Sequence, residues 1–416
     1  MNVQLPFGKE QITLSVPNSN FLKTLTPNAL AEGPMGDEEV IRSLENPIHS
    51  RRLRDLVTPG QKVAIITSDI TRPMPSYVVL PHVLKELNDG GIPDSDITVV
   101  FALGSHRAHT EEEKKKLVGE AVYNRVSCID SKGEFTHMGT TDRGTPVDIF
   151  KPVADADIRI CLGNIEFHYF AGYSGGSKAI MPGVSTRDAI QSNHSRMVQE
   201  AARAGAIEGN PIREDIDEVC ERFVPVDFIV NVVLDEKKRI RRCVSGHFIE
   251  AHREGCRFLD QLYKVQIPKK ADIVVVSAGG YPKDINLYQA QKALDNSKHA
   301  VRDGGCIIWA ASAYEGLGEG VFEKWMTGHK KAHDMIEHIS QDFQLGGHKA
   351  AAIAMVLEKA QIILCSDLEP DFVRSIHLTP GTDPQAELNA ALDRYGKGAT
   401  VIVMPYGGST LPCTQN

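Results

Sequence analysis

Four short stretches of this 416-residue sequence gather the side-chain types that bind small anions and move protons. DITRP carries Asp69 and Arg72, GSHRAH carries His106 and His109, FHYFAGYSGGSKAIMPG carries His168 and Lys178, and GGYPKDINLYQAQK carries Tyr288, Gln289 and Lys292. An arginine binds a carboxylate through two hydrogen bonds, and a histidine accepts or donates a proton near neutral pH. These types favour acid–base chemistry on a small anionic substrate.

Each of these residues also has a purely structural interpretation. Arg72 is able to cap a helix or to pair with Asp69 at the surface, and a histidine is more often a hydrogen-bonded structural residue than a catalyst. The position of His106 after an apolar run and a glycine favours function, and so does the glycine-rich loop that follows His168. His109 lies on the same face as His106 if their loop is helical, so either histidine remains a candidate base here.

The glycine-rich loop AGYSGGSKA is similar to a phosphate-binding loop but does not match one. Lys178 follows Ser177 instead of a glycine and precedes an alanine, so the pattern G-x-x-x-x-G-K-[ST] is not met. The remaining interpretations are a tight turn, a nest of backbone amides that binds an anion, and a desolvated lysine that acts as a nucleophile.

One histidine lies in a pattern that is compatible with a metal ligand. Ser185 and Asp188 fit a capping box that begins a helix over 185–204. His194 lies on or beside the apolar face of that expected helix, which is typical of a core histidine and also of an inward-pointing metal ligand.

A second histidine pair, His329 and His333 in HKKAH, has the four-residue spacing of a zinc helix. The glutamate of H-E-x-x-H is missing, and the neighbouring lysines oppose a cation. We therefore interpret 329–348 as surface helix and loop.

The elements expected around these motifs alternate between strands and helices, which predicts an α/β fold with mostly parallel sheets flanked by helices. The expected strands are 63–69, 96–104, 157–165, 227–235, 272–280, 306–312, 362–367 and 400–405, with a hairpin at 138–150. The expected helices are 76–89, 185–204, 211–223, 248–262, 286–301, 349–360 and 384–395. Ligands bind beyond the carboxyl ends of parallel strands, where the four motifs fall.

A polar, proline-containing break at 263–272 predicts two domains, 1–265 and 272–416, with the site in the crevice between them. The net charge of −8 without a long basic run argues against nucleic-acid binding. Neither a secretory signal nor a membrane-spanning apolar run is visible. The eight cysteines are scattered and form no C-x-x-C pair, so a reducing cytoplasm is expected.

Taken together, the motifs resemble the lactate racemase family, whose members use a nickel-pincer nucleotide. The resemblance rests on SDITRP, GSHR, FHYFAGYSGGSKAIMPG, NHSRM, GGYPKDINLYQAQKAL and PYGGSTLP, which are spread over most of the chain. The glycine-rich block with Lys178 and the GGYPKD block are the specific ones.

The resemblance implies a role for each candidate residue. Lys178 would hold the cofactor covalently, His194 would be a nickel ligand, and His106 and His168 would be the catalytic acid–bases. Arg72 would bind the substrate carboxylate, Tyr288, Gln289 and Lys292 would contact substrate, and Asp69 would shape the cofactor pocket. The implied reaction interconverts D- and L-lactate by hydride transfer to and from the cofactor, with pyruvate as the intermediate. Enzymes that synthesise the cofactor would be the protein's partners.

Three other hypotheses remain open on the sequence. One keeps the cofactor and replaces lactate by malate or a longer 2-hydroxy acid. Another is a carrier protein without turnover, which two acid–base histidines disfavour. The last is a pyridoxal phosphate enzyme with Lys178 as the Schiff-base lysine, which the ligand-like position of His194 disfavours.

Overall fold

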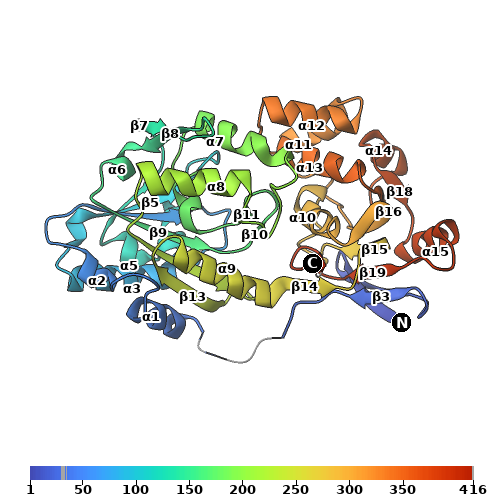
Figure 1. Cartoon of the computed structure of the whole chain (residues 1–416), viewed down its shortest axis with the longest axis horizontal. Helices are drawn as coiled ribbons and strands as arrows, with labels where there is room; N and C mark the ends of the chain where they lie inside the picture. Colours follow the sequence, from blue (N-terminus) through green and yellow to red (C-terminus); the bar gives the residue numbers. More distant parts are fainter. Residues whose placement is uncertain (30–32, 34, 415–416) are drawn as a thin grey trace. The chain divides into compact units, whose positions relative to one another are not determined.

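The computed structural model describes residues 1–29, 33 and 35–414. They form two compact units, one of Ala31–Asp260 and one that combines Met1–Leu30 with Gln261–Asn416. We name these the N-terminal unit and the C-terminal unit. Each contains a sheet of mostly parallel strands with helices against it, which confirms the predicted α/β class (Figure 1). In the described residues no helix is both long and apolar enough to cross a membrane.

The sheet of the N-terminal unit has its strands in an order that brings three of the expected site loops to adjacent positions. The order is β13 (Ile240–Gly246), β12 (Phe228–Leu234), β9 (Ile158–Asn164), β4 (Val63–Ser68), β5 (Ile97–Ala102) and β6 (Ser127–Asp130). All neighbours are parallel except β12 and β13. Because β9, β4 and β5 are adjacent, the loops that follow them leave the same edge of the sheet.

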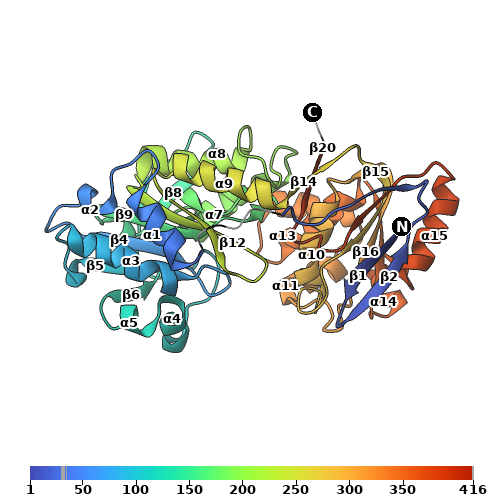
Figure 2. The same ribbon diagram turned by 90° about the horizontal axis from the view of Figure 1, so that it is seen from below.

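The strands of this sheet are apolar on both faces because helices cover both. One face packs against α1 (Asp37–Glu45), α2 (Leu53–Leu56) and α3 (Ser76–Asp89), with α4 (Glu111–Val118) and α5 (Glu120–Tyr123) beside α3. Figure 2 shows α8 (Pro211–Glu218) and α9 (Glu250–Tyr263) on the opposite side. The smaller elements are η1 (Asp94–Asp96), α6 (Lys151–Ala154), the predicted hairpin of β7 (Phe135–Thr140) and β8 (Pro146–Phe150), and η4 (Val219–Phe223).

The predicted helix over 185–204 is wrong in its second half. The α-helix α7 is Arg187–His194, and η3 (Ser195–Val198) adds one further turn. The following segment is a loop in which the Gly205 amide donates to the Gly172 carbonyl at 3.0 Å. Packing against the glycine-rich stretch therefore overrides the local helical preference.

The predicted capping residue of this helix is also wrong by one position. The N-cap is Thr186, whose hydroxyl accepts from the Ala189 amide. The Ser185 hydroxyl instead donates to the Ile180 carbonyl at 2.9 Å, which ties the cap to the glycine-rich segment.

The C-terminal unit is built on a fully parallel sheet. Its order is β18 (Thr379–Gly381), β17 (Gln361–Cys365), β16 (Val301–Ala310), β15 (Ala271–Ser277), β19 (Val401–Met404) and β3 (Phe21–Thr24). The helices are α10 (Leu287–Ser297), α11 (Gly320–Gly328), α12 (Ala332–Gln341), α13 (Gly347–Leu357), α14 (Pro370–Ser375) and α15 (Pro384–Tyr395). A separate parallel pair consists of β14 (Lys264–Ile267) and β20 (Leu411–Thr414).

The start of the chain belongs to the C-terminal unit, whereas the sequence prediction assigned all of 1–265 to the first domain. The hairpin of β1 (Asn2–Phe7) and β2 (Glu10–Ser15) buries Leu5 and Leu14 in the core of the C-terminal sheet, and β3 adds a strand to its edge. Burial of these apolar side chains against a distant part of the sequence holds the segment there. No local sequence pattern of the hairpin or of the edge strand indicates that they pack on the sheet of the C-terminal unit.

Candidate active site

The loops that follow β4 and β5 bring Asp69 and His106 into direct contact. Oδ2 of Asp69 lies 2.5 Å from Nδ1 of His106, and Oδ1 accepts from the Thr71 hydroxyl at 2.8 Å. The Asp69 side chain is buried, while that of His106 is 24% exposed. Burial raises the pKa of Asp69, but the hydrogen bond and charge of His106, with help from Thr71 and Arg72, outweigh it and lower the pKa. The carboxylate therefore accepts, and His106 carries its proton on Nδ1.

The second histidine of this loop, His109, lies in different surroundings from His106. Its loop is not helical, and its side chain is almost completely buried. Nδ1 lies 2.6 Å from Asp130, and Nε2 accepts from the Ile70 amide at 3.0 Å. Both ring nitrogens are thus engaged inside the protein. His106, whose side chain is 24% exposed, is the more accessible of the two, and its role as the base stays a prediction.

The glycine-rich segment forms β10 (Phe167–His168), β11 (Gly172–Tyr173) and the short helix η2 (Gly176–Ala179), which contains Lys178. Gly172 has a φ of 75°, and a Cβ there would lie 1.9 Å from the Ala206 carbonyl oxygen. A Cβ at Gly175 would lie 2.6 Å from the Asn231 side chain, which accepts the Gly176 amide at 2.7 Å. These glycines serve close packing within the protein, and the Gly176 amide is not part of an anion-binding nest.

One aromatic ring contacts three of the predicted site residues. The centre of the Phe170 ring lies 4.4 Å from that of His168 and 4.8 Å from that of His194. Nζ of Lys178 lies over the same ring, 5.7 Å from its centre. Residues that are 26 positions apart in the sequence, His168 and His194, therefore meet beside Lys178. Phe170 carries no sequence signal of this role other than its place in the segment.

The electrostatic environment of this cluster disfavours positive charge. Desolvation by burial lowers the pKa of Lys178 well below its ordinary value, and the nearby Arg213 and Arg72 lower it further. Desolvation also lowers the pKa of His168, with contributions from Lys178, Arg72 and His194. At a given pH, a larger fraction of both groups is neutral than in an ordinary lysine or histidine.

Arg72 connects the two groups of residues. Its charge lowers the pKa of Asp69, which contacts His106, and it also lowers the pKa values of His168 and Lys178 in the cluster around Phe170. Its side chain is exposed, and its backbone amide donates to the Asp69 carbonyl at 3.1 Å. An exposed guanidinium at this position is available to a carboxylate ligand.

A buried carboxylate fixes the ring of His194 through one intermediate side chain. Asp215 accepts from Thr141 and Thr145 at 2.6 Å and from the amide nitrogen of Asn193 at 2.7 Å. The oxygen of Asn193 then lies 2.8 Å from Nδ1 of His194. Since this oxygen only accepts, His194 is protonated at Nδ1 and has its lone pair on Nε2, as a metal-binding imidazole requires.

Arg213 supports the glycine-rich segment through hydrogen bonds to its backbone. It is fully buried, and its guanidinium donates to the carbonyls of Ala171 and Tyr173. His252 of α9 supports the next residue, since its Nε2 lies 2.8 Å from the Ser174 carbonyl. Neither residue is predictable from the sequence, because buried supporting side chains lie far along the chain from the motif that they hold.

The predicted substrate-contacting residues belong to the C-terminal unit, at the start of α10. Asn286 caps this helix by accepting the Gln289 amide at 2.9 Å. Gln289 is exposed, and Lys292 is half-buried three residues further along the helix. The Tyr288 ring packs edge-on against Phe322 at 5.6 Å, and Nζ of Lys349 lies 3.9 Å from its centre. The helix follows the carboxyl end of β15, as predicted.

The HKKAH pair does not converge on a common point. Nδ1 of His329 lies 2.9 Å from the Trp325 carbonyl, whereas His333 pairs with Glu358 at the surface. Among the described residues, no group of three or more histidine, cysteine, aspartate or glutamate side chains is placed to hold a metal ion. The prediction of surface helix and loop for this segment agrees with α12.

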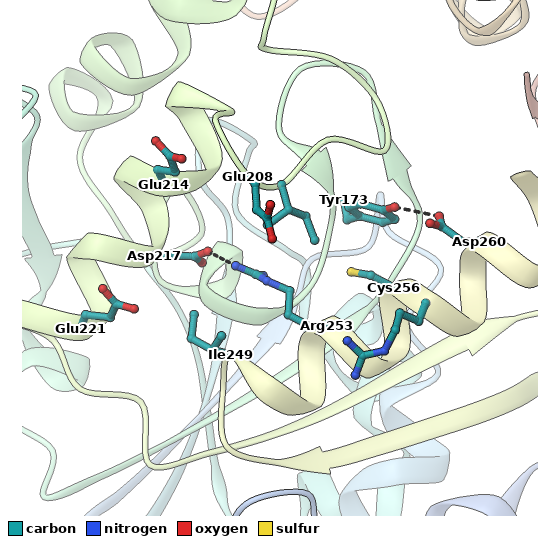
Figure 3. A pocket seen from close by; sticks show the side chains of 11 residues that line it. Tyr173, Glu208, Glu214, Asp217, Glu221, Ile249, Arg253, Cys256 and Asp260 are labelled. Atoms are coloured by element: carbon teal, nitrogen blue, oxygen red, sulfur yellow. Dashed lines mark hydrogen bonds and ion pairs between the residues drawn. The ribbon is translucent and has the colours of Figure 1, made fainter. Parts of the chain in front are cut away.

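A pocket of about 480 Å³ lies in the N-terminal unit between the glycine-rich segment and the helices α8 and α9 (Figure 3). Its lining residues are Tyr173, Ile207, Glu208, Glu214, Asp217, Glu221, Ile249, Arg253, Cys256, Arg257 and Asp260. The Tyr173 hydroxyl donates to Asp260 at 2.7 Å, and Arg253 pairs with Asp217. None of the predicted site residues lines this pocket, so it is a different place from the cluster around Phe170.

Comparison with known proteins identifies the family. A model of the lactate racemase N-terminal domain matches residues 7–205, and a model of the lactate racemase C-terminal domain matches residues 266–411. The chain belongs to the lactate racemase family. It is accordingly an enzyme of the isomerase class.

Two curated relatives of this lactate racemase family member match over nearly their whole length. The lactate racemase of Thermoanaerobacterium thermosaccharolyticum is 33% identical over 423 residues, with 99% of each chain covered. That of Lactiplantibacillus plantarum is 33% identical over 424 residues, covering 97% of this chain and 98% of the relative.

Solved structures agree with the family assignment. The lactate racemase apoprotein of Thermoanaerobacterium thermosaccharolyticum has a TM-score of 0.87 at 31% identity, covering 99% of this chain and 100% of that one. A crystal structure of a Thermotoga maritima protein has a TM-score of 0.64 at 18% identity, covering 93% and 100%, and shares the fold.

Proposed function

We propose that this member of the family interconverts D- and L-lactate, with a nickel-pincer nucleotide held on Lys178 and with pyruvate as the intermediate. The observation that carries the proposal is the meeting of His168, Lys178 and His194 at the Phe170 ring. The full-length similarity to two proteins named lactate racemase supports lactate as the substrate.

The residues of the cluster fit this cofactor chemically. A lysine with a lowered pKa has a neutral amine available for a covalent bond to the cofactor. His194 offers the Nε2 lone pair to nickel. A single protein nitrogen suits a metal whose other ligands come from the cofactor itself, and the described residues contain no larger metal-binding cluster. Lys178 would therefore hold the nucleotide, and His194 would ligate its nickel.

When bound, the cofactor would take a hydride from the α-carbon of the substrate and return it. The chain's own residues would supply orientation and proton transfer. Arg72 would bind the carboxylate in two hydrogen bonds and retain the 2-keto acid between the two half-reactions. Asp69, whose carboxylate contacts His106, would orient that histidine in addition to shaping the cofactor pocket.

The two histidines have complementary tautomers in the structure. His106 carries its proton on Nδ1 towards Asp69, which leaves the lone pair on Nε2 for a substrate hydroxyl proton. Nδ1 of His168 accepts from the Ala171 amide at 3.3 Å, so a neutral His168 carries its proton on Nε2. His106 would therefore accept the substrate hydroxyl proton, whereas His168 would return a proton to the product only from its imidazolium form, because a neutral imidazole that lost its Nε2 proton would become an imidazolate.

The C-terminal unit would contribute Tyr288, Gln289 and Lys292 to substrate binding, and these roles remain predictions. The main alternative substrate is another 2-hydroxy acid, such as malate or a longer aliphatic acid. Malate carries a second carboxylate and needs a second cation at the site. The proposal also requires the enzymes that synthesise the cofactor as partners. The eight free cysteines support a reducing cytoplasm as the proposed compartment.

The decisive experiment is a racemisation assay of protein produced together with the cofactor pathway and nickel. L-lactate, D-lactate, L-malate and a longer L-2-hydroxy acid are each incubated and analysed by chiral chromatography. Interconversion of the lactate enantiomers, with the largest kcat/KM for lactate, is expected. A larger kcat/KM for another acid would replace lactate with that acid. Inactivity on every acid, in protein that carries the adduct on Lys178, would reject the proposal.

A further inference from the structure

A chain of hydrogen bonds runs through the ends of three adjacent strands and finishes at the Asp69–His106 pair. Asp130 ends β6, His109 belongs to the loop after β5, and Asp69 and Ile70 follow β4. Asp130 accepts from Nδ1 of His109 at 2.6 Å and from the His109 backbone amide at 3.0 Å. Nε2 of His109 accepts from the Ile70 amide at 3.0 Å. Each link joins loops of neighbouring strands.

The partners of His109 allow only one arrangement of its proton. A backbone amide only donates, so Nε2 of His109 must be unprotonated. The proton then lies on Nδ1, where the Asp130 carboxylate accepts it. The Phe101 ring, 5.2 Å from the His109 ring, and the near-complete burial of the side chain hold the imidazole in place. This histidine is a fixed acceptor, in contrast to the half-buried His106.

The Ile70 amide has a special position because it is the peptide that immediately follows Asp69. Ile70 is 36% exposed, so its side chain is only partly packed against the protein. The hydrogen bond to His109 therefore fixes the backbone at the point where Asp69 directs its carboxylate to His106. Misalignment of a reacting group by about 1 Å is enough to lower a rate about 100-fold.

We propose that His109 and Asp130 are positioning residues that keep the Asp69 carboxylate aligned on Nδ1 of His106. This inference rests on the proposed function only insofar as His106 is the acid–base group. The two histidines of GSHRAHT then have separate tasks: His106 exchanges protons with the substrate, and His109 sets the tautomer of His106 through the Ile70 peptide and Asp69.

The test compares His109→Phe and His109→Gln in cofactor-loaded enzyme. Phenylalanine keeps the ring against Phe101 but cannot accept from Ile70, whereas the glutamine oxygen can. We expect His109→Phe to lower kcat about 10- to 100-fold with KM within about twofold of wild type, and His109→Gln to recover most of kcat. The matched control is His137→Phe, which removes another histidine–aspartate pair of the same unit, the exposed one with Asp148.

A second readout does not depend on activity. ¹⁵N spectra of histidine-labelled apoprotein distinguish the two imidazole tautomers, and the His106 signals are assigned with His106→Gln. Wild type and His137→Phe should show His106 protonated at Nδ1, and His109→Phe should show a mixture of tautomers. If His109→Phe does not fold, Asp130→Asn replaces it, because the amide no longer forces the His109 proton onto Nδ1.

The outcomes separate the two proposals. A reduced kcat with a mixed His106 tautomer and rescue by His109→Gln supports the positioning role. A near-normal kcat, or a reduced kcat with an unchanged His106 tautomer, overturns it. If wild-type holoenzyme racemises no 2-hydroxy acid, the proposed function fails, and the tautomer of His106 in the apoprotein still decides whether His109 positions it.

Discussion

The Asp69 carboxylate lies 2.5 Å from Nδ1 of His106, and this contact defines the protonation of the imidazole. Asp69→Asn removes the charge and presents an amide that is able to donate to Nδ1, which favours the wrong tautomer. We expect kcat to fall about 100-fold, within the usual contribution of acid–base catalysis. The measurement is racemisation by protein loaded with cofactor.

Cofactor loading must be measured separately for this variant, because Asp69 was also predicted to contact the cofactor. Intact mass shows whether the adduct on Lys178 is present. A loss of activity that merely follows a loss of adduct would contradict the role in orienting His106, and so would a kcat equal to that of wild type.

Lys178 should react as a neutral amine at lower pH than an ordinary lysine, whose pKa is about 10.4. Burial, Arg213 and Arg72 lower its pKa in the folded protein. Acetylation of the apoprotein by acetic anhydride, followed by peptide mass spectrometry across pH, should reach half its maximum at lower pH than in urea-denatured protein. The denatured chain is the matched control because the same peptide is measured. Identical pH profiles would disprove the shift.

Gly172→Ala should destabilise the N-terminal unit much more than Gly144→Ala. Both glycines have a left-handed φ, of 75° and 81°. A Cβ at Gly172 would lie 1.9 Å from the Ala206 carbonyl oxygen, whereas a Cβ at Gly144 meets nothing within 4 Å. The backbone strain is similar, so the difference in unfolding free energy, about 1–3 kcal/mol, reports the steric contact. Equal destabilisation in urea titrations would show that the loop moves away from Ala206.

The strands and most helices were predictable because their apolar patterns are local. The runs around Val63, Ile97 and Ile158 are continuous and apolar, which is typical of strands covered on both faces. Asp69, His106 and His168 follow these runs in the sequence, so they were expected beyond the carboxyl ends of the strands. The second half of the predicted helix over 185–204 failed because packing at Gly172 determines its path.

The supporting residues were not predictable, since their roles depend on contacts between distant segments. His109 is a second candidate base on the sequence, and only the structure shows that its ring nitrogens contact Asp130 and the Ile70 amide. Asn193 adjoins the predicted nickel ligand, yet only the structure shows that Asp215 orients its amide. A local pattern shows which side chains are present, and the tertiary structure decides which of them face the site.

Asn193→Ala should weaken the retention of nickel while leaving the chain folded. The Asn193 oxygen holds the Nδ1 proton of His194, and removing it frees the ring to rotate or change tautomer. Loss of such an orienting partner lowers metal affinity about 10- to 100-fold. Nickel per chain is measured by elemental analysis after dialysis against a chelator, with the exposed Asn124→Ala as control. Equal nickel in the two variants would mean that Asn193 does not orient His194.

Glu86 of α3 should give the N-terminal unit a stability that is lost in acid. Its side chain is 6% exposed and accepts from Arg52 at 2.6 Å and from Arg54 at 2.5 Å. Burial raises its pKa, but hydrogen bonds from Arg54 and Arg52 outweigh this and lower the pKa from 4.5 to about 2. Because the folded pKa is the lower one, the stabilisation is complete above the unfolded pKa and is lost as the pH falls towards about 2.

Glu86→Gln is the variant that isolates this contribution. At pH 7 it should reduce the unfolding free energy by about 1–2 kcal/mol relative to wild type, less than the full pKa shift corresponds to, because solvent around the two arginines screens the interaction. The difference should shrink as the pH is lowered from about 4.5, because wild type then protonates the same carboxylate that the variant lacks. Urea unfolding at several pH values measures both quantities, and Glu112→Gln on the exposed side of α4 is the control. A difference between wild type and Glu86→Gln that stays constant down to pH ~3 would show that the arginines do not stabilise the ionised form.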